Sequence, residues 1–263
     1  MRFRDQLNRE IELPAKTQRI ISLVPSITEL LIDLGLSGRL VGRTRFCIHP
    51  KGEIESIESI GGTKTVSLEK VKALRPDFIV ANKEENEREQ VEALARDYPV
   101  YISDVDDLPS GLEMIRDLGE ITGQKVKGEE IASQLESSFL ALRADGDKKR
   151  VAYLIWRKPY MTVGGDTFIH NLLDRAGYEN VFADHKRYPQ VRLEDIREAD
   201  PDLVFLSSEP YRFTEKHYSE FEKAIPNALP LIVDGELFSW YGSRLLHSTE
   251  YFKELKDLIE SKL

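Results

Sequence analysis

The chain has 263 residues, 41% of them hydrophobic and 32% charged, which is enough for one large core or two smaller ones. Its net charge of -9 and pI near 5.3 disfavour nucleic acid as a partner, because nucleic-acid binders normally present a basic face, and argue weakly against an anionic membrane surface. Cys47 is the only cysteine, which excludes an intrachain disulfide and a multi-cysteine metal site.

The first 13 residues, MRFRDQLNREIEL, are charged and polar and contain neither the apolar core of a signal peptide nor a cysteine that could carry a lipid. No apolar stretch approaches the ~20 residues of a membrane-spanning helix. As written, the sequence predicts a cytoplasmic protein that is not inserted in a membrane. A signal located upstream would make it periplasmic or extracellular instead.

The next segment predicts a strand followed directly by a helix. Residues 20–24 (IISLV) are typical of a buried strand, and Ser26 with Glu29 forms a capping-box pattern at the start of a helix. Gly35 is placed to end that helix. Such a unit presents backbone N–H groups and a small hydroxyl at the carboxyl edge of a parallel sheet, where ligands commonly bind. The alternative is a well-capped strand–helix unit with no binding role.

An internal repeat is the most informative feature of the sequence. Residues 68–80 (LEKVKALRPDFIV) and 193–205 (LEDIREADPDLVF) align without gaps. Each copy predicts a short helix that Pro-Asp separates from a buried strand. Because RIISLV at Arg19 is echoed by RVAYLI at Arg150, and YPVYISD by LPLIVDG, the similarity covers most of each half of the chain.

Each half reads strand, helix, helix, strand, helix, strand, which predicts an α/β fold with parallel sheets and helices on both faces. We therefore expect two similar Rossmann-like lobes, residues 1–107 and 149–263. Residues 108–148 are interpreted as a linker that contains one long amphipathic helix, crosses once between the lobes and leaves little hinge freedom. A ligand is expected in the cleft between the lobes.

Four stretches, RIISLVPSITELL, GGTKTVSLEKVKALRPDFIVANKEEN, YPQVRLEDIREADPDLVFL and LPLIVDGELFSWYGSRLL, resemble the class III solute-binding proteins of ABC importers, and in particular their cobalamin-binding branch. The resemblance runs from about Arg19 to the C-terminus. It implies two α/β lobes joined by one long helix. It also implies that the protein binds a metal chelate, foremost a cobalamin-like corrinoid, without a cofactor and without chemistry of its own.

The resemblance further implies which side chains contact the ligand, and aromatic faces with a few polar donors suit a flat chelate. On the first lobe these are Pro25, Ser26, Phe46, Thr63, Lys64, Lys83 and Glu84; on the second they are Trp156, Tyr188, Phe238, Trp240 and Arg244. Cobalamin binders carry tryptophan where this chain has Lys64 and Lys83, which would suit a more anionic ligand or a corrin with other side groups. Any one of the aromatic residues could instead belong to the core.

Two glutamates, Glu69 and Glu194, stand at the positions where relatives carry the carboxylates that dock on arginine pockets of an ABC permease. One lies in each copy of the repeat, so the pair would orient the protein on a two-fold partner. The alternative is that each carboxylate only favours the dipole of its own helix, for ~0.3–1 kcal/mol. We expect the chain itself to be a monomer.

Other activities remain open alternatives. Cys47 and His49 would point to one side of an extended segment and, with His185, are candidate ligands for an unidentified metal, although a buried thiol beside a partly exposed histidine is the simpler interpretation. GGTKT and VGGDT lack the spacing of nucleotide-binding loops, so we do not expect an enzyme. The alternatives are an iron-siderophore or haem binder, a cytosolic two-lobed metal chelatase that uses His49 or His185, and a cytoplasmic sensor or carrier.

Overall fold

The computed structural model describes residues 1–142 and 147–262, so residues 143–146 of the predicted linker lie outside the described residues. The chain forms two compact units. The first comprises residues 1–105, 109–136 and 241–245, and the second comprises residues 106–108, 137–240 and 246–263. In the part of the chain that is described, no helix has the length and apolar character needed to cross a membrane.

The first unit is built on a five-stranded sheet in which all neighbouring strands are parallel. In spatial order its strands are β5 (Glu58–Ser59), β4 (Leu40–Arg43), β3 (Ile20–Ser22), β8 (Phe78–Asn82) and β9 (Val100–Ser103). Its helices are α1 (Pro25–Asp33), α2 (Leu68–Leu74), α3 (Arg88–Ala95) and α4 (Leu108–Ile121), with short 3-10 turns η1 (Ser37–Arg39) and η2 (Ile54–Ser56). A small antiparallel pair, β6 (Gly61–Gly62) and β7 (Thr65–Val66), follows β5.

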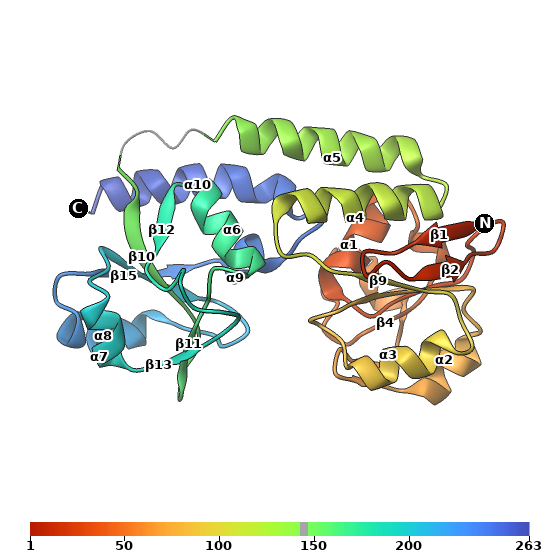
Figure 1. Cartoon of the computed structure of the whole chain (residues 1–263), viewed down its shortest axis with the longest axis horizontal. Helices are drawn as coiled ribbons and strands as arrows, with labels where there is room; N and C mark the ends of the chain where they lie inside the picture. The colour runs from red at the N-terminus through yellow and green to blue at the C-terminus, as the bar shows by residue number, and fades with distance from the viewer. Residues whose placement is uncertain (143–146, 263) are drawn as a thin grey trace. The chain divides into compact units, whose positions relative to one another are not determined.

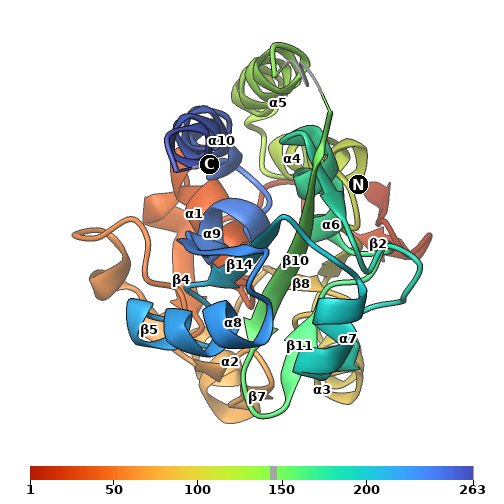
Figure 2. The ribbon, with the colours of Figure 1, turned by 90° about the vertical axis from the view of Figure 1, so that its left-hand side faces the viewer.

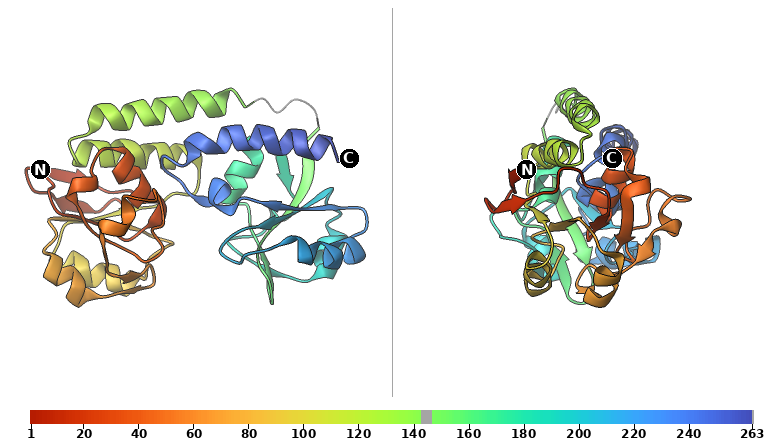
Figure 3. Two further views of the ribbon diagram at one scale, coloured as in Figure 1. Left: turned by 180° about the vertical axis from the view of Figure 1, so that it is seen from behind. Right: turned by 90° about the vertical axis from the view of Figure 1, so that its right-hand side faces the viewer.

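Alternating apolar side chains bury both faces of this sheet. Ile21, Ile79 and Val100 pack in one cluster with Val71 of α2 and Val91 of α3. On the opposite face, Tyr101 of β9 is buried and its hydroxyl donates to Asp117 of α4. Figures 1 and 3 show α1 and α4 on one side of the sheet and α2 and α3 on the other. The predicted α/β architecture is therefore confirmed for this unit.

Helix α1 ends as predicted but begins differently. Gly35 has a φ of +85°, its N–H donates to Ile32 O, and the N–H of Leu36 donates to Leu31 O, which is the hydrogen-bond pattern of a glycine C-cap. The helix starts at Pro25, so Ser26 lies inside the first turn and Val24 is the cap residue, without a side-chain hydrogen bond. The predicted capping box is therefore wrong.

An N-terminal hairpin covers the edge strand β9, a feature that the sequence did not indicate. Strands β1 (Arg2–Arg4) and β2 (Glu10–Glu12) pair antiparallel, and the loop between them reaches β9. Asp5 accepts the N–H of Ile102, and Arg9 donates to Val100 O at 2.8 Å. These side chains satisfy backbone groups that an exposed edge strand would leave open to another chain.

The second unit has a sheet in the order β13 (Gln190–Val191), β11 (Tyr160–Thr162), β10 (Lys149–Trp156), β14 (Leu203–Ser207) and β15 (Leu229–Val233). Strand β12 (Tyr178–Asn180) pairs with the beginning of β10, at Lys149–Val151, whereas β11 pairs with the end of β10, at Leu154 and Trp156. Strands β10, β12, β14 and β15 are parallel, whereas β11 and β13 are antiparallel to their neighbours. The helices are α6 (Phe168–Arg175), α7 (Leu193–Glu198), α8 (Tyr218–Ala224), α9 (Gly235–Ser239) and α10 (Leu245–Glu260), with the turn η3 (Glu215–His217).

Helices cover both faces of this sheet as well. Leu154 and Val204 share a core cluster with Ile196 of α7 and Phe221 of α8, and Figure 2 shows these two helices beside the sheet. In both units the predicted order of elements omitted strands, namely β4, β5, β6 and β7 in the first unit and β11, β12 and β13 in the second. All of these except β4 have only two or three residues, too few for a periodic signal.

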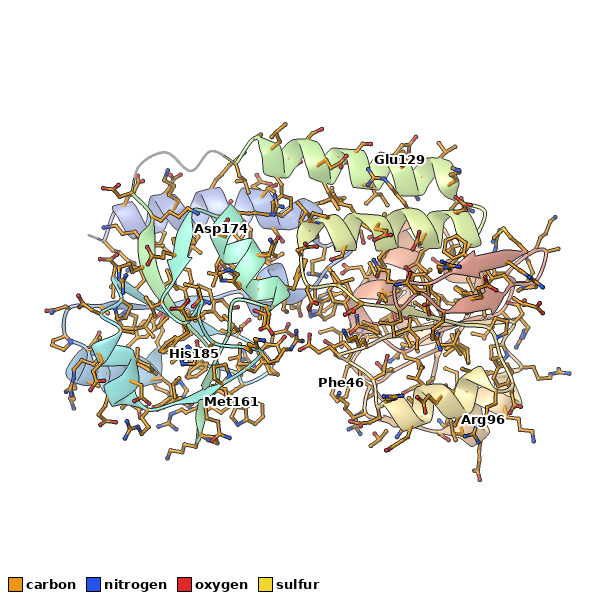
Figure 4. The ribbon with its side chains drawn as sticks, in the orientation of Figure 1. Phe46, Arg96, Glu129, Met161, Asp174 and His185 are labelled. Carbon is orange, nitrogen blue, oxygen red and sulfur yellow. The ribbon has the colours of Figure 1, made fainter. Side chains whose placement is uncertain are left out.

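The helical segment after β9 consists of two helices, α4 and α5 (Lys125–Leu140), which lie side by side (Figure 1). A Cβ on Gly119 would be 3.2 Å from the Cα of Gly128, and Arg116 pairs with Glu129, which Figure 4 labels. Helix α5 is the predicted long helix that joins the lobes, since it belongs to the first unit up to Glu136 and to the second after it. Tyr241–Leu245 return to the first unit, so the chain passes between the units at more places than the single crossing predicted.

Candidate functional site

The carboxyl edge of the first sheet carries most of the candidate residues of this unit. Pro25 is half-buried and Ser26 is buried at the start of α1, and Thr63 is half-buried in the turn between β6 and β7. Two buried amides that the sequence analysis missed hold this edge together. Asn82 donates to the Ser103 backbone and hydroxyl, and Asn86 donates to Leu23 O and Thr63 O.

The two lysines predicted to mark an anionic ligand are exposed but already paired. Lys64 Nζ donates to Glu84 O at 2.8 Å and lies 3.7 Å from a carboxylate oxygen of Glu87. Lys83 Nζ lies 2.7 Å from Asp104 Oδ2. Neighbouring acidic and carbonyl groups therefore partly offset these positive charges, which disfavours a role for the two lysines in selecting an anionic ligand.

Phe46 and Cys47, adjacent in the chain, have opposite environments. Phe46 is 48% exposed on the surface of the first unit (Figure 4), and the guanidinium carbon of Arg45 lies 4.9 Å from its ring centroid. Cys47 is buried, with its Sγ 3.1 Å from Thr28 Oγ1 and 3.3 Å from Thr44 Oγ1. Burial raises the pKa of the Cys47 thiol, which disfavours the thiolate needed for metal binding.

The candidate metal ligands are divided between the two units. His49 is half-buried in the first unit, whereas His185 is exposed in the second, where its ring lies 5.6 Å from that of Phe182 (Figure 4). Over residues 1–142 and 147–262 no three His, Cys, Asp or Glu side chains are grouped so that they could hold a metal ion.

Arg244 was assigned to the second lobe but belongs to the first unit. Its guanidinium forms two hydrogen bonds to the carboxylate of Glu29, at 2.6 and 2.7 Å, and both side chains are largely buried. Its planar fork is therefore engaged by a carboxylate inside the unit.

In the second unit three predicted aromatic residues reach the surface. Trp156 ends β10, is 39% exposed and has its ring 5.8 Å from that of Tyr211. Tyr188 is half-buried beneath the guanidinium of Arg187, at 5.6 Å. Trp240 is half-buried and follows α9. Such faces can stack on a flat, conjugated ligand.

Phe238 differs from its predicted role. Its side chain is fully buried and its ring centroid lies 5.3 Å from that of Tyr153, 6.1 Å from that of Phe205 and 4.7 Å from that of Phe252. It therefore packs the core of the second unit instead of facing a ligand. Tyr211 and Glu209 were missed, although they directly follow the buried strand β14, at the sheet edge where ligands commonly bind.

The two candidate docking carboxylates are both exposed and lie in the first turns of α2 and α7. Neither forms an ion pair within the described residues. Glu194 also borders a shallow hollow of about 370 Å³ that is lined by Lys158, Pro159, Tyr160, Val191, Arg192 and Leu193.

Sequence comparisons identify relatives over most of the chain. The family model described as "Periplasmic binding protein" matches residues 20–229. The Vitamin B12-binding protein of Vibrio parahaemolyticus is 31% identical over 197 residues, which cover 72% of this chain and 70% of that protein. The uncharacterized ABC transporter substrate-binding lipoprotein YvrC of Bacillus subtilis is 27% identical and covers 95% of this chain and 83% of its own length.

Solved structures show the same fold. The periplasmic vitamin B12 binding protein BtuF of Vibrio cholerae superposes with a TM-score of 0.78 at 24% identity, over 92% of this chain and 99% of its own. The periplasmic heme-binding protein RhuT from Roseiflexus sp. RS-1 gives a TM-score of 0.77 at 20% identity, over 90% and 98%. Together with the family match and the 31% identical relative, these likenesses confirm the predicted resemblance, and the chain belongs to the periplasmic binding protein family of substrate-binding proteins.

Proposed function

We propose that the protein is the substrate-binding component of an ABC importer, that it binds a metal chelate, foremost a cobalamin-like corrinoid, and that it catalyses no reaction. The observation that carries this proposal is the presence of exposed aromatic faces, Phe46 on one unit and Trp156 on the other, in a chain 31% identical to a protein named for binding vitamin B12. A corrin is flat and broad, so it gains more from aromatic faces than from ion pairs.

The pairing of Lys64 and Lys83 with acidic or carbonyl partners supports a corrinoid over a strongly anionic chelate. The candidate ligand contacts of the first unit are Pro25, Ser26, Phe46, Thr63 and Glu84, and those of the second unit are Trp156, Tyr188 and Trp240.

Haem is the second candidate, and one observation favours it. Arg45 places a cation over the exposed ring of Phe46, so an aromatic face and a carboxylate-binding group stand together. A haem-binding structure also shares this fold.

The test is a calorimetric titration of the purified protein with cyanocobalamin, dicyanocobinamide, haemin and a ferric siderophore. We expect saturable binding of a corrinoid at micromolar or tighter affinity and recovery of the ligand unchanged. Phe46→Ala and Trp156→Ala should each weaken binding by about tenfold or more, as removal of a stacking side chain does. Val126→Ala, at another exposed apolar side chain, should leave it unchanged. Binding of none of the four ligands would overturn the proposal, and tight binding of haemin alone would establish the second candidate.

We further propose that Glu69 and Glu194 dock the protein on its permease from outside the cytoplasmic membrane. The exposure of both side chains supports the docking role. The description of relatives as periplasmic or as a lipoprotein supports a location outside the cytoplasmic membrane in place of the cytoplasm. The double variant Glu69→Gln/Glu194→Gln should keep the ligand affinity and lose stimulation of the ATPase of the reconstituted transporter. Glu89→Gln, an equally exposed first-turn glutamate of α3, is the control. Full stimulation by the double variant would contradict this docking mode.

A further inference from the structure

We infer that Glu209 is a positioning residue for ligand binding: it fixes the indole of Trp240 so that the ring presents its face, and not its N–H, to a bound chelate. This inference rests on the proposed function. Trp240 Nε1 donates to Glu209 Oε1 at 2.9 Å, and the hydroxyl of the neighbouring Ser239 donates to the same oxygen at 2.8 Å.

The backbone of Glu209 is itself held by hydrogen bonds. Its backbone N–H donates to the hydroxyl of Ser207, and that hydroxyl donates to the Glu209 carbonyl oxygen. The N–H of Gly235 donates to Ser208 Oγ at 2.9 Å, so the start of α9 is fastened to the same loop. Because its backbone is held and its Oε1 accepts from both Ser239 and Trp240, Glu209 can support the indole in one orientation.

Gly235 shows how closely the start of α9 approaches the loop after β14. A Cβ at this position would lie 2.6 Å from Glu209 Cγ and 2.3 Å from Ser207 Oγ, so only glycine leaves room for them. The loop after β14 and the helix after β15 are thus packed directly together at the carboxyl edge of the sheet, where Trp240 emerges.

Fixing the ring before binding has two consequences for recognition. The rotational freedom of the indole is already lost in the unliganded protein, so the ligand does not have to restrict it. The indole N–H already donates to Glu209, so the part of Trp240 that we assign to the ligand is the apolar face of the ring, which suits the flat surface of a tetrapyrrole.

The test uses Trp156→Phe as the parent, which leaves Trp240 as the only tryptophan. Steady-state anisotropy of Trp240 reports the mobility of the ring without ligand, and a calorimetric titration with cyanocobalamin reports affinity. Glu209→Ala should lower the anisotropy and weaken binding by about five- to tenfold, the loss expected when one side chain must be immobilised on binding. Glu209→Gln keeps the acceptor oxygen and should restore both values, and Glu222→Ala, an exposed glutamate of the same unit, should change neither.

Unchanged anisotropy in Glu209→Ala, or an equal loss of affinity in the Gln and Ala variants, would overturn the inference. If Glu209→Ala fails to fold, Trp240→Phe supplies the second measurement, because it keeps an aromatic face and lacks the N–H. In the Trp240→Phe background we expect Glu209→Gln to cause no further loss of affinity. An additional loss in that background would contradict the inference. If the wild-type protein binds none of the chelates, the proposed function is contradicted, whereas the anisotropy of the unliganded Trp156→Phe variants still decides whether Glu209 positions Trp240.

Discussion

Arg244 and Glu29, which are 215 residues apart in the sequence, form a bidentate ion pair within the first unit. Their side chains are only 14% and 10% exposed. The pair fastens residues 241–245 to α1 and gives Glu29 a role other than the capping box that its spacing predicts, which is ruled out because α1 begins at Pro25. A pair this well shielded holds two desolvated charges that depend on each other.

Removing one partner of this pair should therefore be costly. We expect Glu29→Gln to lower the free energy of unfolding by about 3–5 kcal/mol, because it leaves the guanidinium buried and uncompensated. Urea denaturation measures this. Arg88→Ala, which breaks the exposed pair with Glu92, should cost no more than about 0.5 kcal/mol. The double variant Glu29→Met/Arg244→Met should recover most of the loss, and its failure to do so would show that the cost does not come from the unpaired charge.

The hairpin loop at the edge of the first sheet leads to a second prediction. The side chain of Asp5 is fully buried and accepts hydrogen bonds from the guanidinium of Arg9 and from the N–H of Ile102. Asp5→Ala should lower the free energy of unfolding by about 3 kcal/mol, since it orphans the partly buried cation of Arg9. It should also uncover β9 and promote self-association, which light scattering would detect. Glu12→Ala, in the exposed pair with Arg2, is the control, and a monomeric Asp5→Ala protein of normal stability would refute the role of this loop.

The internal repeat shows how much of the fold is predictable from sequence. Arg75 and Asp200, which align in the two copies, both precede proline and both have a φ of 46°. Two residues after each, an aspartate accepts a backbone N–H from the beginning of the neighbouring strand: Asp77 from Arg19, directly before β3, and Asp202 from Arg150 in β10. The Pro-Asp motif is local and repeated, so a single sequence reveals it, whereas the hydrogen bonds that it makes join residues 58 and 52 positions apart and are evident only in the structure.

The burial and the partners of the candidate site residues could not be predicted from their spacing in the sequence. Phe238 and Trp240 are two residues apart, yet one is fully buried in the core and the other is partly exposed and bonded to Glu209. Lys83 looks like a free cation in the sequence but meets Asp104 across neighbouring strands. Tertiary packing determines which neighbours a charged or aromatic side chain contacts, and the spacing of residues in the sequence does not reveal it.

Gly235 gives a third prediction, on the packing beside Trp240. Gly235→Ala should cost about 1–3 kcal/mol of unfolding free energy, because its methyl group would overlap Ser207 Oγ and Glu209 Cγ. Gly38→Ala is a matched control, since nothing lies within 4 Å of a Cβ built there. Equal stabilities of the two variants in urea denaturation would mean that the loop before Pro210 yields without cost.

The carboxyl group of Asp117 makes the stability of the first unit depend on pH. Desolvation between α4 and β9 raises its pKa to about 6, with further increases from the charges of Glu113, Glu120 and Asp5, although the hydrogen bond from Tyr101 acts in the opposite direction. The folded protein therefore binds this proton more tightly than the unfolded chain, whose carboxyl has a pKa of 3.8. Stability from this group is present below the unfolded value and is lost as pH rises toward 6, by about 1 kcal/mol once solvent screening is allowed for.

Asp117→Asn should remove this part of the pH dependence. We expect urea denaturation at a series of pH values to show the wild-type protein losing stability relative to the variant as pH rises from about 4 to about 6. Asp195→Asn is the control: its carboxylate has a pKa lowered to about 2 by hydrogen bonds from Arg192, so its contribution is lost only as pH falls below the unfolded value. Parallel stability curves for wild type and Asp117→Asn across this window would show that the Asp117 proton is not linked to folding.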